Sequence, residues 1–373
     1  MCIDKKTAPA EMKLLYLPNE TSPGDQVGPR AAFNTLIGQG RLAGLEIFSF
    51  RVEARKFGST DHLWEKLLEK AETFEPDIVL FQHIGRFPIA RSIIIRIKSI
   101  RSRPTVAYQE GDVFGRLFKP FTRSMKAIVK ESDIVFLVGL GENAKRFLKY
   151  GAKHIRYSPS CVDTIRFGSN WNPTTEREFD IVMIANRAAS RFPLLNFVRW
   201  GRMPGSFERE RLVRRLGEVF GERFAIFGHG WDSFIGNRGP IPFNDQEKTM
   251  RKAWLTIGWN HFHTIPYFFP NRLPISLASG IAHLTNYQEG YENLFRNGEH
   301  LVWAQSVEGI VDTARVLLSH RPGQLIKLGL RGRAFALKNL TSQVVYESIL
   351  ERIATFRQNK GHVAHFLLKK AEG

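Results

Sequence analysis

A histidine and two acidic residues follow the ends of two apolar runs in the first third of the chain. His83 comes directly after residues 77–82, Glu110 ends the next apolar run, and Asp112 lies two positions further on. Because catalytic groups in open α/β proteins usually lie at the carboxyl ends of parallel strands, we expect these side chains to share one sheet edge. An imidazole or carboxylate there could accept a proton from a hydroxyl group. Each of the three could instead cap a loop or a helix.

A second set of polar side chains lies in the last third of the chain. Asn271 and Arg272 precede a short apolar segment that ends at Ser279 and Gly280. A guanidinium group can bind two phosphate oxygens at once, and the start of a helix favours anions. Glycine at the end of the segment permits a left-handed helix cap. The pattern therefore predicts a loop and helix start that bind phosphate.

Two further loops in the second half follow apolar runs and carry polar or glycine residues. They contain, in order, Arg187 and Arg191, and then Gly228, His229 and Gly230. A lone Gly-x-Gly is weak evidence for a phosphate loop, although its place after an apolar run strengthens it. In a chain this basic, a given arginine is more often a solvated surface residue. His229 could contact a phosphate or a base, or have no role.

Short apolar runs alternate with helical patterns along the whole chain, which predicts an α/β protein with parallel sheets. The runs are residues 12–17, 44–50, 77–82, 104–109, 133–138, 155–157, 179–185, 224–227, 254–258, 282–285 and 300–303. A polar segment with Pro173 interrupts them. We therefore expect an N-terminal domain over 12–168, a linker over 169–178 and a C-terminal domain over 179–341. Residues 342–373 would form a C-terminal helix and tail that pack back on the N-terminal domain.

Composition places the chain among ordinary globular proteins. Its 373 residues are 43% hydrophobic and 24% charged, and no apolar run approaches the roughly 20 residues of a membrane span. Residues 1–11 are polar and lack the apolar core of a signal peptide. Cys2 and Cys161 are the only cysteines, which favours a reducing, cytoplasmic environment.

The net charge of +18 indicates an anionic partner. Residues 86–130 contain eleven basic side chains, opposed only by Glu110 and Asp112. Within them, residues 114–130 separate into an apolar and a basic face at helical spacing, so they could lie on the inner face of an anionic membrane. Pro120 indicates that this helix begins or kinks there. Helices that cover a sheet also need an apolar face. We favour the sheet for the apolar faces and expect the basic side chains to contact something anionic.

Residues 269–286 resemble the nucleotide-sugar site of GT-B glycosyltransferases of the group 1, or family 4, type and of spore-maturation-protein-like relatives. Residues 157–167, 184–191 and 224–231 match the same pattern in the expected order. The resemblance covers most of residues 12–350. It implies an α/β fold of GT-B architecture, with two Rossmann-like domains facing an interdomain cleft.

The resemblance also implies roles for the polar residues. The donor would be a nucleotide-sugar substrate, a UDP- or GDP-sugar, bound without a metal or other cofactor. Its contacts would be Arg187, Arg191, Gly228, His229, Gly230, Asn271, Arg272, Ser279, Gly280 and Glu289. The glycine-bearing loop with Gly24, Asp25 and Gly28 would approach the donor and acceptor. His83, Glu110 and Asp112 are then the catalytic candidates.

The chain departs from the family at one motif. Two glutamates eight positions apart are typical of family 4, and the matching positions here hold Tyr267 and Ile275. Isoleucine cannot hydrogen-bond a ribose. Ribose recognition would therefore fall to Glu289 or Glu292, or the donor differs.

The expected activity is transfer of a hexose, with a retaining course, to a hydroxyl acceptor that is a glycan, a glycolipid or a small molecule. Many family members act on lipid-linked acceptors at the cytoplasmic leaflet, so the resemblance makes such an acceptor one of the candidates. One alternative is a GT-B-fold nucleotide-sugar epimerase. Another is a basic protein that binds nucleic acid, which we do not expect because no nucleic-acid motif is present. Glu110 and Asp112 also resemble the metal motif of GT-A enzymes, but a single such motif in a duplicated α/β pattern favours GT-B.

Overall fold

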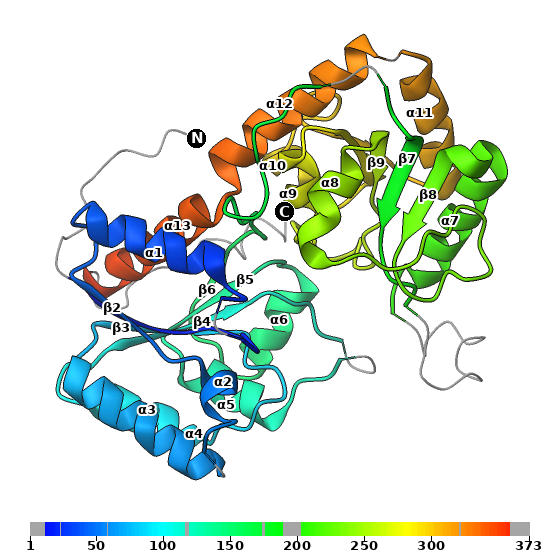
Figure 1. Ribbon diagram of the computed structural model, residues 1–373. Coiled ribbons are helices and arrows are strands. Elements are labelled where there is room, and N and C mark those ends of the chain that lie inside the picture. Colours follow the sequence, from blue (N-terminus) through cyan, green and yellow to red (C-terminus); the bar gives the residue numbers. More distant parts are fainter. Residues whose placement is uncertain are drawn as a thin grey trace. The chain divides into compact units, whose positions relative to one another are not determined.

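The structure is a computed structural model that describes residues 12–22, 24–57, 59–115, 119–173, 176–188, 203–320 and 322–358. The chain divides into two compact units, each built on one parallel sheet (Figure 1). Unit 1 takes the described residues up to Gly115, from Pro120 to Ser158 and from Ser342 onward. Unit 2 takes Lys119 and those from Pro159 to Thr341. The predicted α/β class with two Rossmann-like units is confirmed.

Unit 1 contains a six-stranded parallel sheet in the order β2-β1-β3-β4-β5-β6. Its strands are β1 (Lys13–Leu17), β2 (Gly44–Ile47), β3 (Ile78–Gln82), β4 (Thr105–Glu110), β5 (Ile134–Leu137) and β6 (Ile155–Tyr157). The inner strands are buried along almost their whole length. Strands buried on both faces have continuous apolar sequences instead of alternating ones, which is why the sequence indicated these strands.

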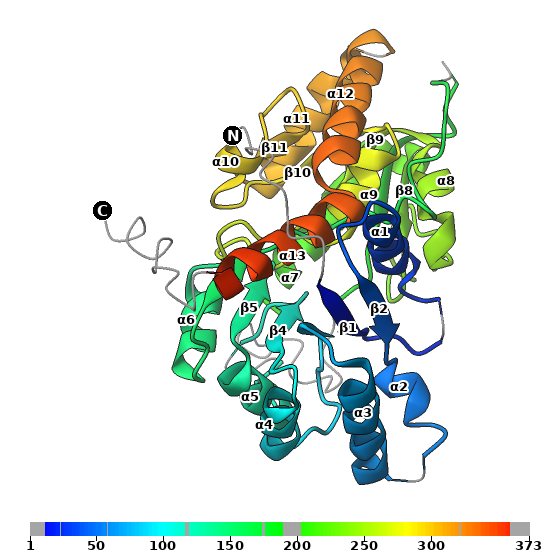
Figure 2. The same cartoon turned by 90° about the vertical axis from the view of Figure 1, so that its left-hand side faces the viewer.

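The helices of unit 1 cover both faces of this sheet. They are α1 (Val27–Gly38), α2 (Phe50–Glu53), α3 (Thr60–Phe74), α4 (Arg91–Ser99), α5 (Arg123–Glu131), α6 (Glu142–Lys149) and α13 (Ser342–Gln358). Helix α13 lies beside α1 although the sequence separates them widely (Figures 1 and 2). The Tyr346 ring of α13 contacts the ring of Phe33, with 5.2 Å between centroids. The last helix therefore belongs to unit 1, whereas residues 359–373 lie outside the described part.

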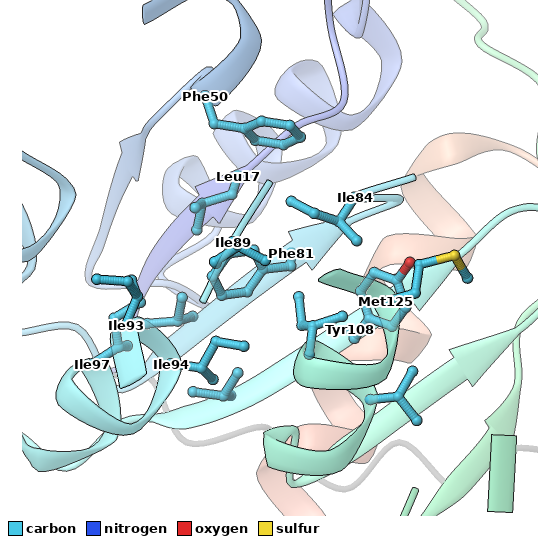
Figure 3. Close-up of a cluster of buried hydrophobic side chains, with 14 of the residues drawn as sticks. Leu17, Phe50, Phe81, Ile84, Ile89, Ile93, Ile94, Ile97, Tyr108 and Met125 are labelled. Carbon is cyan, nitrogen blue, oxygen red and sulfur yellow. The ribbon is translucent and has the colours of Figure 1, made fainter. Parts of the chain in front are cut away.

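The core of unit 1 joins the sheet to α4 and α5. Leu17, Phe81 and Tyr108 from three neighbouring strands lie near Ile94 of α4 and Met125 of α5 (Figure 3). All of these side chains are buried. The apolar faces of α4 and α5 therefore cover the sheet, as we favoured from the sequence.

Within the amphipathic pattern over 114–130, the helix follows Pro120, where the sequence predicts that it begins or kinks. Helix α5 begins only at Arg123, and its cap is Thr122, whose hydroxyl accepts a hydrogen bond from the Met125 amide at 3.2 Å. Pro120 lies just before this cap. Proline removes a backbone donor and restricts the residue before it, so a helix more readily starts after it than continues through it.

Unit 2 contains a five-stranded parallel sheet in the order β11-β10-β9-β7-β8. Its strands are β7 (Phe179–Ile184), β8 (Phe224–Phe227), β9 (Ala253–Ile257), β10 (Ala282–Asn286) and β11 (Val302–Ala304). Its longer helices are α7 (Ser206–Phe220), α11 (Val307–Ser319) and α12 (Gly323–Asn339), and its shorter ones are α8 (Gln246–Met250), α9 (Arg272–Ala278) and α10 (Tyr291–Leu294). Helices α7 and α11 pack against each other beside this sheet.

The predicted end of the N-terminal domain, at residue 168, lies ten residues too late, because the main segment of unit 2 begins at Pro159. Residues 159–168, which we assigned to the N-terminal domain, belong to unit 2. The Val162 amide donates to the Leu340 carbonyl at 2.8 Å, and the Gly168 amide donates to Glu247 at 2.8 Å. Backbone hydrogen bonds of this kind are invisible in a linker-like sequence, because they depend on residues far along the chain.

Candidate functional site

His83 and Glu110 are joined at the carboxyl edge of the unit 1 sheet. Strands β3 and β4 pair in parallel with Gln82 opposite Gln109, so the residues that follow are neighbours. His83 Nδ1 lies 2.5 Å from Glu110 Oε1. The Tyr108 hydroxyl donates to Glu110 Oε2 at 2.5 Å. The sheet register therefore brings together two of the three catalytic candidates.

Glu110 holds His83 in place. Its side chain is fully buried, and its oxygens also accept the Asp112 amide at 2.9 Å. Burial, together with the charge of Glu110, raises the pKa of Tyr108 well above its usual value, so Tyr108 stays a hydrogen-bond donor. The His83 side chain is 21% exposed, and its Nε2 lies 3.8 Å from Asp112 Oδ2. Of the hydrogen-bonded pair, His83 is therefore the accessible member, and Glu110 is its positioning residue.

The same three side chains have the spacing of a cation site. One potential ligand atom from each of His83, Glu110 and Asp112 lies within 4.8 Å of the others. Imidazole and carboxylate ligands suit divalent transition metals. The expected independence from metal ions therefore stays a prediction.

The predicted glycine-bearing loop of unit 1 is organised by its own aspartate. Asp25 accepts hydrogen bonds from the amides and hydroxyls of Thr21 and Ser22, at 2.7 to 3.0 Å. These bonds, that of the Ser22 hydroxyl foremost, hold the pKa of Asp25 well below its usual range. Gly24 adopts a positive φ of 102° in this turn, and Gly28 is buried in α1. Asp25 and Gly28 thus have structural roles that the spacing did not reveal.

Unit 2 has a pocket of about 340 Å³ at the carboxyl ends of β7 and β8 and the start of α9. Four of the predicted donor-binding residues line it: Gly228, His229, Asn271 and Arg272. Its other walls include Asn186 and the apolar side chains of Phe227, Ile241 and Phe243. An apolar pocket with a few polar groups at one end is the usual form of a small-molecule site.

Glycine is required at one position of this pocket. Gly228 has φ +148°, and a Cβ atom there would lie 2.2 Å from the Ala185 carbonyl oxygen. The next amide, of His229, donates to Asn186 Oδ1 at 3.0 Å. The β8 turn therefore packs directly on the chain that leaves β7, which gives the Gly-x-Gly pattern its structural reason.

Two arginines meet beside this pocket without an acidic partner. Arg209 of α7 is only 4% exposed, and it donates to the Trp259 carbonyl at 2.6 Å and the Asn186 carbonyl at 3.2 Å. Burial lowers the pKa of Arg209, with a further contribution from the positive charge of Arg272. Burial also lowers the pKa of Arg272. Within the described ranges no carboxylate pairs with either arginine, so an anion is the missing partner.

Further polar atoms without partners surround Arg209. Arg209 Nε, Ser206 Oγ, Trp259 Nε1 and His261 Nδ1 are buried and make no hydrogen bond. Burial, and then the charges of Arg209 and Arg272, lower the pKa of His261 to about 2, so its ring is neutral at pH 7. Buried polar groups are nearly always hydrogen-bonded in native proteins. A group of exceptions around two cations therefore marks a site for an anionic ligand.

The sequence analysis missed Arg209, although the sequence contained a signal. Arg209 occupies the same helical face as Leu212, Val213 and Leu216, all of which are buried. A charged residue on the apolar face of a helix is rarely fully buried without a partner. The place of Arg209 on an apolar helix face is therefore the sequence signal that distinguishes it from the other arginines of the chain.

Arg187 is turned away from the pocket. It donates to Glu210 at 3.2 Å, and its guanidinium lies 5.4 Å from the centroid of the Phe234 ring. A carboxylate already balances its charge. Arg191, the other arginine of this predicted loop, lies outside the described residues.

Three other predicted donor contacts lie away from the pocket. Ser279 and Gly280 are buried at the opposite end of α9 from Asn271, and the Ser279 hydroxyl donates to the Ser276 carbonyl at 2.6 Å. Glu289 is exposed, and its carbonyl accepts the Tyr267 amide at 2.7 Å. We had placed the phosphate contacts along the whole segment, but only the start of α9 reaches the site.

The two positions that depart from the family pattern take structural roles. Ile275 is buried in an apolar cluster with Val162, Phe167 and Met250. Tyr267 has a positive φ of 65°, and its ring packs against Gly290. Neither residue lines the pocket of unit 2.

Several basic side chains of residues 86–130 are paired with acids. Arg91 lies 2.5 Å from Glu131, and Lys98 lies 2.6 Å from Asp133. Arg96 donates to Glu65 at 2.8 Å. The surface is therefore less positive than the local sequence indicates, and contact with an anionic membrane stays a prediction. Among the described helices, none has the length and apolar character of a membrane span.

Comparison with known proteins bears on both units. Residues 208–351 match a family described as glycosyl transferase-like. No curated protein matches the sequence. Among solved structures, a glycosyltransferase from Rickettsia africae has a TM-score of 0.61 and 14% identity, over 93% of this chain and 98% of that one.

Two other solved structures are informative. HepE from Anabaena in complex with UDP has a TM-score of 0.57 and 12% identity, over 92% of this chain and 100% of that one. A putative UDP-N-acetylglucosamine 2-epimerase from Listeria monocytogenes has a TM-score of 0.52 and 13% identity, over 94% of this chain and 97% of that one. Identities this low establish the fold alone. The family match adds residues 208–351, which include Arg209 and Arg272 of unit 2 and the first turns of α13 in unit 1. The chain therefore has the GT-B fold, and over these residues its sequence is similar to the glycosyl transferase-like family.

Proposed function

We propose that this protein transfers a sugar from a UDP-sugar to a hydroxyl acceptor. The observation that carries the proposal is the pair of arginines without carboxylate partners, Arg209 and Arg272, beside the pocket of unit 2. A nucleoside diphosphate supplies both the negative charge that the arginines lack and a flat group for the pocket. The complex of HepE with UDP supports uridine as the nucleoside.

The donor would bind with its nucleoside against Gly228, His229 and the apolar wall, and with its diphosphate on Arg209 and Arg272. Transfer breaks the bond between the sugar and the diphosphate, so negative charge builds up on the leaving group. Fixed cations in a buried site stabilise such charge more strongly than they would in water. The two arginines can therefore stabilise the charge of the leaving diphosphate without a metal ion.

The acceptor hydroxyl would bind at the unit 1 edge, near His83. Glu110 fixes the ring of His83, which is the arrangement of a general base and its orienting group. The resemblance to family 4 implies a retaining course, whereas an oriented base serves direct, inverting attack. The anomeric proton coupling of the product, measured by NMR, decides between the two courses.

The first experiment measures UDP binding by calorimetry in the wild type, Arg272→Ala and Arg209→Met. Each variant removes a charge-assisted contact, so the dissociation constant should rise about 10- to 100-fold. Arg296→Ala is the control, because Arg296 is exposed in unit 2 and pairs with Glu299. If all four proteins bind UDP equally, or none does, the proposed donor site is wrong.

Epimerisation is the second candidate, favoured by the likeness to the putative Listeria epimerase. An epimerase needs no acceptor and releases an altered sugar nucleotide. Incubation with UDP-sugars alone, followed by chromatography, distinguishes the two activities. Release of an epimerised UDP-sugar without acceptor would replace transfer by epimerisation.

A further inference from the structure

A half-buried arginine at the edge of unit 1 also lacks an acidic partner. Arg51 of α2 follows β2, and its Nε donates to Asn19 Oδ1 at 2.5 Å. Its guanidinium lies 5.7 Å from the ring centroids of both Phe50 and Phe87. Among the residues that the structure describes, no carboxylate pairs with it. Arg51 is thus held in one place by neutral groups.

Arg51 borders the same space as His83. Gly85 has φ +58°, and a Cβ atom there would lie 3.1 Å from His83 Nε2 and 3.5 Å from Arg51 Nη2. The Gly85 carbonyl accepts the Thr122 hydroxyl at 2.8 Å, which holds this loop against the start of α5. Both the guanidinium of Arg51 and the imidazole nitrogen of His83 therefore lie against Gly85.

The charges around Arg51 and His83 are unevenly balanced. Glu110 directs its two oxygens at His83, Tyr108 and the Asp112 amide. Asp112 lies on the His83 side, with its side chain 45% exposed. Burial lowers the pKa of Arg51, and no other cause contributes. A desolvated cation that is fixed by stacking and lacks its counter-ion is well suited to bind a phosphate or carboxylate.

We propose that the acceptor carries an anionic group, a phosphate or a carboxylate, which binds Arg51 while the acceptor hydroxyl lies at His83. This inference rests on the proposed transfer reaction and names the class of its acceptor. Phosphate chemistry of this kind occurs both in soluble sugar phosphates and in phospholipid headgroups. The two sources differ in the experiment below.

The test compares glycerol 3-phosphate with glycerol, the neutral molecule that lacks the phosphate, by NMR titration with and without saturating UDP. In the wild type we expect the phosphate to bind at least about 10-fold more tightly than glycerol, as one charge-assisted bond provides. Arg51→Gln should remove this difference and leave UDP affinity unchanged. The control is Arg96→Gln, because Arg96 is exposed and paired with Glu65.

Arg51→Lys is the control that separates a loss of binding from a failure to fold. It keeps the charge but loses the guanidinium fork, so it should bind glycerol 3-phosphate more tightly than Arg51→Gln and less tightly than the wild type. Equal binding of glycerol 3-phosphate by the wild type and Arg51→Gln overturns the inference, and so does equal binding of glycerol and its phosphate. Absence of UDP binding in the wild type would overturn the transfer reaction alone.

Vesicles identify the source of the anion. Phosphatidic acid vesicles that bind the wild type but not Arg51→Gln, with phosphatidylcholine vesicles as the neutral control, assign the site to a lipid headgroup. If Arg51 is needed to bind soluble glycerol 3-phosphate but not vesicles, the site belongs to a soluble acceptor. Both outcomes support an anionic acceptor.

Discussion

The two sheets have the same strand order. Carboxylates surround the histidine at the carboxyl edge of one sheet, whereas two arginines lie together at that of the other. At the unit 1 edge, His83 lies between the carboxylates of Glu110 and Asp112. At the unit 2 edge, Arg209 and Arg272 lie close together with no described carboxylate near enough to pair with them. Parallel strands determine where a site forms, because their carboxyl ends meet at one edge. The side chains in the loops then determine what each site can bind, so the fold alone does not set the reaction.

The largest effect on kcat should come from substitutions at the carboxyl edge of the unit 1 sheet. His83→Ala should lower kcat about 10²- to 10⁴-fold, because a positioned general base contributes that much. Glu110→Gln should give a smaller loss, since it can keep a hydrogen bond to the ring but not the charge. KM for the UDP-sugar should stay unchanged in both variants. Unchanged kcat in His83→Ala would leave this edge without a catalytic role.

In unit 2, the stability of the protein should depend on the close contact between the backbone at Gly228 and the Ala185 carbonyl. Gly228→Ala places a Cβ atom 2.2 Å from the Ala185 oxygen, at a φ of +148° that other residues rarely adopt. We expect the free energy of unfolding, measured in urea, to fall by about 3 kcal/mol or more. Gly323→Ala is the matched control, because no atom lies within 4 Å of its added Cβ. If both variants are equally stable, the turn is not held as the structure shows.

A buried histidine of the unit 2 sheet should make the stability of the protein depend on pH. Burial lowers the pKa of His283 in unit 2 from 6.5 to about 4. The unfolded chain therefore takes up a proton as the pH falls below about 6.5 while the folded chain does not, so stability falls between about pH 6.5 and 4, by up to roughly 3 kcal/mol.

His283→Gln should make this pH dependence shallower in urea unfolding between pH 7 and pH 4. A residual slope should remain, because the pKa of His261 is lowered as well. An identical slope in the wild type and His283→Gln would show that His283 is not held neutral by burial.

The smallest effect should come from Arg187, which the sequence placed in the donor site. Because Glu210 already pairs with it and it does not line the pocket, Arg187→Ala should weaken UDP binding by no more than about threefold. Arg209→Met, by comparison, removes a cation without an acidic partner. Equal losses in the two variants would remove the distinction between paired and unpaired arginines on which the donor site depends.

The periodicity of the chain was a good guide to the elements of both units. The strands of both units differ from the predicted apolar runs by a few residues at most. Helix α5 begins just after Pro120, where the sequence predicts that the helix begins or kinks, although the amphipathic pattern extends back to residue 114. Local periodicity reports which face is apolar and not where a helix starts.

The site was only partly predictable. His83 and Glu110 followed from their places after apolar runs, and Arg272 followed from its place before a helix. Arg209 did not, since its importance depends on the absence of a carboxylate near it in space. Ser279 and Gly280 were misplaced because α9 separates them from the pocket by its length.

The sequence by itself determined the strand order along the chain, the two α/β halves and the residues that stand at strand ends, because hydrophobic periodicity is a local property. Only the tertiary structure decided which charges are balanced. Arg187 and Arg209 are both arginines of one half of the chain, yet one meets Glu210 and the other is buried among carbonyl oxygens and unpaired donors. Charge balance depends on distances between residues that are far apart in sequence, and these distances exist only after folding.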